Sequence, residues 1–120
     1  MPLAIVRHRP GLDALGLGSI TFRLPFLISS VLSATDEGAG LKPEDVEVEV
    51  RPFGERDTTQ GYAFTVVILA NDYPGRRKIL EAAARRIGEE ARRCFPSNTP
   101  GFVWILLAPA AFYGFGVRED

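Results

Sequence analysis

Alternation of apolar and polar positions in one segment, and short apolar runs in three others, predict four strands in this chain. The clearest case is Asp45 to Arg51, where valines at 46, 48 and 50 alternate with charged residues, so that one face is buried and the other is polar. Residues 62–70 are apolar on both faces, which is typical of a central strand covered on each side. Two further apolar runs, at 3–8 and 102–108, predict the first and last strands.

Apolar residues at helical spacing predict two helices. The first runs from Pro25 to about Thr35, with the proline in the first turn, where no amide donor is needed. The second runs over about 76–95, and its pairs Glu81 with Arg85 and Glu89 with Arg93 have the favourable i,i+4 order. The arginines of this helix are most simply a solvent-exposed face, and Cys94 lies on its inner stripe as a small hydrophobic residue.

The order strand, helix, strand, strand, helix, strand predicts an α+β fold made of two β-α-β halves, as a single domain over residues 1–120. Because β-α-β crossovers are nearly always right-handed, both helices should cover one face of a four-stranded mixed sheet. The other face would then expose the apolar residues of two strands. Such a surface is usually covered by association, so we expect a compact oligomer whose sheets pack around a shared centre.

Composition narrows the classes of function. With 46% apolar residues, 24% charged residues and a net charge of −1, the chain has no general attraction to nucleic acid or to an anionic membrane. One cysteine excludes an internal disulfide, and one histidine makes a zinc site improbable. We expect no apolar run to reach the roughly 18 residues that span a bilayer and no signal peptide to precede the first strand, and we therefore expect a cytoplasmic protein.

The residue with the sharpest chemistry is Pro2, directly before the first strand. Removal of Met1 would leave a proline with a free secondary amine. A terminal amine has an ordinary pKa of roughly 7.7–8.0, and burial in an apolar cleft lowers that pKa by disfavouring the charged form. Such a nitrogen can act as a general base near neutral pH. The plain alternative is that proline at position 2 only permits methionine removal.

Several stretches together resemble the tautomerase superfamily, most closely its 5-carboxymethyl-2-hydroxymuconate isomerase branch. The matching stretches are Met1-Pro2 before a short apolar strand, Leu24-Pro25, Leu41 to Val50, Tyr62-Ala-Phe64, Gly75-Arg76, and Tyr113-Gly-Phe-Gly116. They follow the family's order over nearly the whole chain. The resemblance implies a double β-α-β fold and a homotrimer with active sites between neighbouring subunits.

The resemblance also implies a chemistry. Pro2 would act as general base in the tautomerisation or isomerisation of a small 2-oxo or 2-hydroxy acid, with no metal and no organic cofactor. A cation would hold the substrate carboxylate. Many tautomerases carry an arginine on the second strand where this chain has Glu47. The substrate-binding candidates are therefore Arg51, Arg7, Arg76, Tyr113 and Phe112.

Two alternatives stay open at this stage. The first is a non-catalytic protein of the same fold, serving in assembly or small-ligand binding, because a retained Met1 would turn the Pro2 nitrogen into an amide without a basic lone pair. The second is a ferredoxin-like βαββαβ domain of another family, which has the same order of elements along the chain. The order of strands within the sheet separates this second alternative from the tautomerase-like fold.

Overall fold

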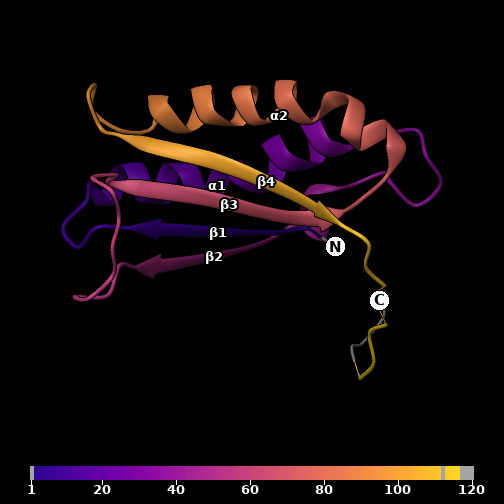
Figure 1. Cartoon of the computed structure of the whole chain (residues 1–120), viewed down its shortest axis with the longest axis horizontal. Helices are drawn as coiled ribbons and strands as arrows, with labels where there is room; N and C mark the ends of the chain where they lie inside the picture. Colours follow the sequence, from indigo (N-terminus) through magenta and orange to yellow (C-terminus); the bar gives the residue numbers. More distant parts are fainter. Residues whose placement is uncertain (1, 112, 117–120) are drawn as a thin grey trace.

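The computed structural model describes residues 2–111 and 113–116, and it contains two β-α-β units (Figure 1). The first unit consists of β1 (Leu3–His8), α1 (Ala14–Leu32) and β2 (Glu47–Pro52), with a 3-10 turn at Pro43–Asp45 before β2. The second consists of β3 (Phe64–Asn71), α2 (Pro74–Arg93) and β4 (Gly101–Ala108). The predicted order of elements is confirmed.

The strands form one mixed sheet in the order β2-β1-β3-β4. Strand β1 is parallel to β2, β3 is parallel to β4, and the central pair β1 and β3 is antiparallel. The two strands of each β-α-β unit are therefore neighbours, whereas a ferredoxin-like sheet separates them with another strand. The ferredoxin-like alternative is wrong, and the arrangement is the double β-α-β fold. Exchanging the first unit with the second leaves the order and directions of the strands unchanged.

The core lies between the sheet and the helix layer. Alternate strand residues face the helices and are buried, as in Ala4 and Val6 of β1 and Val66 and Ile68 of β3, all with no exposed surface. These strand residues pack against a buried stripe of α1 whose members are four residues apart, namely Ile20, Leu24, Ile28 and Leu32. They also pack against a buried stripe of smaller residues on α2, namely Ala83, Ile87 and Ala91. The prediction of two helices on one face of the sheet is confirmed.

Helix α1 starts a full three turns earlier than its predicted start at Pro25. Asp13 caps it, because the carboxylate accepts a hydrogen bond of 3.3 Å from the Gly16 amide. Pro25 lies inside the helix and not in its first turn. A proline inside a helix removes one backbone hydrogen bond. Here the buried stripe continues on both sides of Pro25, so tertiary packing outweighs the missing bond.

The outer face of α1 is also apolar. Leu15, Phe22 and Phe26 are 85%, 73% and 55% exposed, and the two phenyl rings pack with centroids 5.7 Å apart. With apolar residues on both faces, α1 is long and apolar enough to cross a membrane by length and composition alone. The sequence-based estimate of apolar run length missed this property because it started the helix at Pro25. The core helix of a soluble protein meets the same criterion, so the property is weak evidence for a membrane.

The face of the sheet opposite the helices is largely apolar and open. The strand register forms rungs across it, one of which joins Leu3, Leu69 and Leu106, and the next of which joins Ile5, Val67 and Trp104. Leu69 is 41% exposed and Trp104 is 59% exposed. At the β2 edge the same rungs end in Glu47 and Glu49. This open face is the surface that we expect other copies of the chain to cover in an oligomer.

Candidate active site

Pro2 lies at the start of β1, one of the two central strands. It is among the fully buried residues of the chain. Its carbonyl oxygen accepts a hydrogen bond of 3.1 Å from the Glu47 amide, which ties the residue to β2. The proline thus occupies a fixed, dry position at one end of the sheet.

An apolar depression begins one residue beyond Pro2, on the open face. Its volume is about 240 Å³, and it is lined by Leu3, Leu69, Ala70, Asn71, Leu106, Ala108 and Ala110. These residues belong to the start of β1, the ends of β3 and β4, and the first residues after β4. Apart from Asn71 the walls are aliphatic, so a small ligand here would make mainly apolar contacts on a face that is open to solvent.

Arg7 and Arg51 lie at the opposite end of β1 from Pro2. They are register partners on β1 and β2, and Arg7 is five positions along the chain from Pro2, which is about 16 Å at the rise of a strand. Arg7 pairs with Asp57 at 2.6 Å and lies over the Phe53 ring, while Arg51 pairs with Glu49. Within one chain, therefore, neither arginine is brought to the proline.

Arg76 is at the same end of the sheet as Pro2, because α2 begins just after β3 ends, but it serves the fold. It is 2% exposed, and its guanidinium donates to the carbonyl oxygens of Leu32 at 2.8 Å, Asn71 at 3.1 Å and Ala39 at 3.1 Å. Burial lowers the pKa of Arg76 from its ordinary value, and Tyr73 and Asp36 oppose that shift. The side chain thereby joins α1, the loop after it and β3.

The two aromatic candidates follow β4. Tyr113 is 87% exposed and stacks on Phe115 with ring centroids 6.5 Å apart, on a segment that leaves the body of the domain (Figure 1). Phe112 lies outside the described residues. An extended segment with exposed aromatic rings is suited to contact another molecule rather than its own domain.

The sequence-based analysis missed the polar groups after β3. Asn71 lines the depression, and Asp72 follows it with one carboxylate oxygen, Oδ1, that accepts no hydrogen bond although the Arg77 Nε lies 3.0 Å away. Arg77 is largely exposed, unlike its neighbour Arg76. A signal was present, because polar residues directly after an apolar central strand gather at one edge of a sheet. The sequence alone did not show that this edge is close to Pro2, because that follows from the antiparallel pairing of β1 and β3.

Solved structures share this fold over nearly their whole length. A macrophage migration inhibitory factor-like protein from Entamoeba histolytica matches 95% of this chain and 94% of its own, with a TM-score of 0.65 and 11% identity. A wild-type fused 4-OT symmetric trimer matches 95% of this chain and 91% of its own, with a TM-score of 0.65 and 14% identity. A malonate semialdehyde decarboxylase matches 98% of this chain and 92% of its own, with a TM-score of 0.64 and 16% identity. That protein was also solved with its first-residue proline changed to alanine.

Comparison by sequence finds no matching family model and no matching curated protein. The structural neighbours include tautomerase-superfamily proteins, so the chain has the tautomerase-like fold that its sequence led us to expect. At identities of 11 to 16% this likeness concerns the fold.

Proposed function

We propose that this chain is a cofactor-independent tautomerase or isomerase that acts on a small 2-oxo or 2-hydroxy acid, with the Pro2 nitrogen as its general base. The observation that carries the proposal is the burial of Pro2 at the end of a central strand, one residue before Leu3, which lines an apolar depression. A buried amine loses its proton more readily than one in water, which suits a base working near neutral pH. The malonate semialdehyde decarboxylase neighbour was also solved with its first-residue proline changed to alanine, and this is a further reason to test Pro2.

The proposed reaction moves one proton. The Pro2 nitrogen accepts the hydroxyl proton of an enol acid, which leaves an enolate, and the resulting pyrrolidinium returns a proton to the adjacent carbon, which completes the ketone. Atoms and charge balance without a cofactor. Burial of Pro2 limits the access of bulk water to the nitrogen in this proposal.

The proposed assembly is a homotrimer, as in the fused 4-OT neighbour. It would cover the open face of the sheet and bring a neighbouring subunit to each depression. That neighbour could supply what one chain lacks beside Pro2: a cation for the substrate carboxylate, from Arg7 or Arg51, and an aromatic wall from Tyr113 or Phe112. Glu47 cannot fill the first role, because its carboxylate repels an anionic substrate.

The test uses protein whose N-terminus is verified as Pro2 by mass spectrometry. Ketonisation of phenylenolpyruvate is compared between this protein, the Pro2→Ala variant and a preparation that retains Met1. We expect a loss of roughly 10²-fold or more in kcat/KM for both altered forms, because general base catalysis typically contributes 10²–10⁴-fold. In the unaltered protein kcat/KM should fall on acidification, with an apparent pKa below the ordinary 7.7–8.0 of a terminal amine.

Equal rates in all three proteins would overturn the proposal and favour the non-catalytic alternative of an assembly or small-ligand binding protein. The malonate semialdehyde decarboxylase neighbour, which has decarboxylase and hydratase activities, shows why the substrate must be tested directly. One fold can serve several reactions.

A further inference from the structure

A second cavity lies between α2 and the beginning of β4, far from Pro2. Its volume is about 250 Å³, and it is lined by Phe64, Gly88, Ala91, Arg92, Thr99, Pro100, Gly101, Phe102 and Val103. Gly101 pairs with Phe64, which pairs with His8 at the far end of β1, so the cavity is at the other end of the sheet. It shares no lining residue with the depression beside Pro2.

The cavity exists because α2 presents small residues to β4 at this point. Gly88 and Ala91 are the α2 residues that line it together with Arg92. A Cβ added at Gly88 would meet no atom closer than Val103 Cγ2, at 3.8 Å. By contrast, a Cβ at Gly101 would overlap the Phe64 ring at 2.5 Å, so the sheet side is already filled. The open space therefore lies next to the helix.

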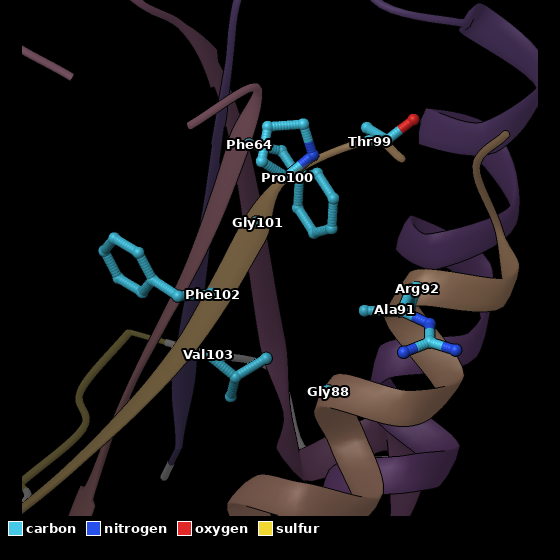
Figure 2. A pocket seen from close by; sticks show the side chains of 9 residues that line it. All are labelled: Phe64, Gly88, Ala91, Arg92, Thr99, Pro100, Gly101, Phe102 and Val103. Carbon is cyan, nitrogen blue, oxygen red and sulfur yellow. The ribbon is translucent and has the colours of Figure 1, made fainter. Parts of the chain in front are cut away.

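Most of the walls are apolar. Figure 2 shows the rings of Phe64 and Pro100 together at one end of the cavity, and the Val103 side chain directed toward Gly88. The Phe102 ring points away from α2 in the same view. The hydroxyl of Thr99 donates to the Pro96 carbonyl oxygen at 2.7 Å, so its proton is already used.

The charged group in the lining is Arg92, on the α2 side (Figure 2). Among the described residues, no ion pair involves Arg92, although Glu89 lies one turn earlier beside it. Glu90 instead pairs with Arg93 at 3.0 Å and with Arg23 at 3.7 Å. The side chain of Arg92 is exposed and also lines two neighbouring hollows, so its guanidinium donors are open both to solvent and to a ligand in this apolar space.

We propose that this cavity binds a small monocarboxylate with a compact apolar body, such as a single ring or a short branched chain. The planar guanidinium of Arg92 matches a carboxylate with two parallel hydrogen bonds, and the apolar body fills the space beside Gly88. The volume is below the roughly 300–1,000 Å³ of sites for drug-sized ligands, which favours a small molecule. A single cation favours one negative charge over a phosphate. The site does not use Pro2, so it stands independently of the proposed activity.

The test is a titration of isotope-labelled full-length protein with phenylacetate, and with the neutral phenylacetamide as matched ligand, followed by NMR. We expect saturable shifts at the Gly88 amide and the Val103 methyls. Arg92→Gln and the use of phenylacetamide should each weaken binding about tenfold or more, as the loss of a charged hydrogen-bond partner does. Gly88→Leu, which fills the cavity, should abolish binding. Arg85→Gln, an exposed arginine on the same helix that lines neither cavity, should bind within about twofold of the unaltered protein.

Shifts confined to Leu3, Leu69 and Asn71 would overturn this proposal, since they would place the ligand beside Pro2. Equal affinity for the acid and the amide, or binding unchanged by Arg92→Gln, would also overturn it. Should Gly88→Leu fail to fold, the comparison of Arg92→Gln with Arg85→Gln still decides. Failure of this test leaves the Pro2→Ala assay unaffected, because the two cavities are separate.

Discussion

At the scale of single residues, Arg76 and Arg77 are adjacent in sequence and opposite in role. Arg76 satisfies three backbone carbonyls from three segments, whereas Arg77 is largely exposed beside Asp72. Replacement of Arg76 by methionine would remove all three of these hydrogen bonds from the interior, although the Ala39 carbonyl oxygen would keep the one from the Ala34 amide at 3.2 Å. We expect the free energy of unfolding to fall by about 3 kcal/mol or more, because each unsatisfied buried polar group costs about 1–3 kcal/mol.

Arg77→Met is the matched control for this change, and it should cost less than about 1 kcal/mol because exposed ion pairs contribute little. Urea denaturation of both variants measures the difference. Similar losses for the two would show that the hydrogen bonds of Arg76 do not stabilise the fold as described.

Glu47 offers a second test at this scale. Its side chain is exposed on the rung that contains Leu3, next to the depression. Glu47→Arg would replace a repulsive charge by an attractive one near the proposed substrate carboxylate. We expect kcat/KM for phenylenolpyruvate to rise about tenfold, mainly through a lower KM, since a charge reversal near a partly exposed site changes the interaction by about 1–2 kcal/mol.

Glu49→Arg provides the control, because Glu49 faces the same way one rung, or about 7 Å, further along β2. A smaller gain is expected there. If both variants gained equally, the effect would come from the net charge of the protein and not from a carboxylate held beside Pro2.

At the scale of elements, two glycines of α1 differ in how closely the rest of the protein packs against them. A Cβ at Gly16 would lie 2.6 Å from the Cys94 carbonyl oxygen and 2.5 Å from the Phe95 ring, whereas a Cβ at Gly18 would meet nothing within 4 Å. Gly16→Ala should therefore destabilise the protein by about 1–3 kcal/mol through overpacking.

Gly18→Ala should stabilise the protein by up to about 1 kcal/mol, because alanine is the better helix former. Thermal unfolding of the pair makes the comparison, and both substitutions add the same methyl group to the same helix. A stabilising Gly16→Ala would contradict the close contact between the start of α1 and the end of α2.

Periodicity predicted the elements and their order, but it did not predict where α1 begins. Pro25 is typical of a first turn, and the stretch before it contains glycines, so local propensity favoured a late start. The helix extends back to Asp13 because Ile20 and Leu24 are buried in the same stripe as Ile28. Such tertiary packing is not visible in local propensities.

The site was predictable only in part for a related reason. Pro2 is identified by its chemistry and its place beside Met1, which need no structure. Which cations accompany it depends on register, and register placed Arg7 and Arg51 together at the far end of β1. Arg76 is buried and Arg77 is largely exposed, a distinction that two adjacent arginines in the first turn of an amphipathic helix do not reveal.

At the scale of the whole molecule, the domain exposes apolar residues on both outer faces. Trp104 lies on the open face of the sheet, and Phe22 lies on the outer face of α1. If the proposed trimer covers the sheet, Trp104→Glu should give monomers in sedimentation velocity experiments, because an unpaired charge in an apolar interface is strongly unfavourable.

Phe22→Glu is the control for this experiment, since it places the same charge on the helix layer. It should leave the oligomer intact. Monomers from Phe22→Glu together with an intact oligomer from Trp104→Glu would assign the interface to the helices and contradict a trimer that is closed by the sheets.

The exchange symmetry of the sheet has a consequence for the two ends of the domain. Leu3 begins one half against Glu47, and Phe64 begins the other half against Gly101, so a twofold rotation would carry the end of the sheet that holds Pro2 to the end where the hollow beside Gly88 lies. That hollow is on the helix side of the sheet, whereas the depression near Pro2 is on the open side. The residue before Phe64 is Ala63, in mid-chain, and its nitrogen is necessarily an amide. A chain built from two like halves has a single beginning, and hence one place for a basic backbone nitrogen. The corresponding end of the second half has no such nitrogen, and the function that we propose there is binding alone.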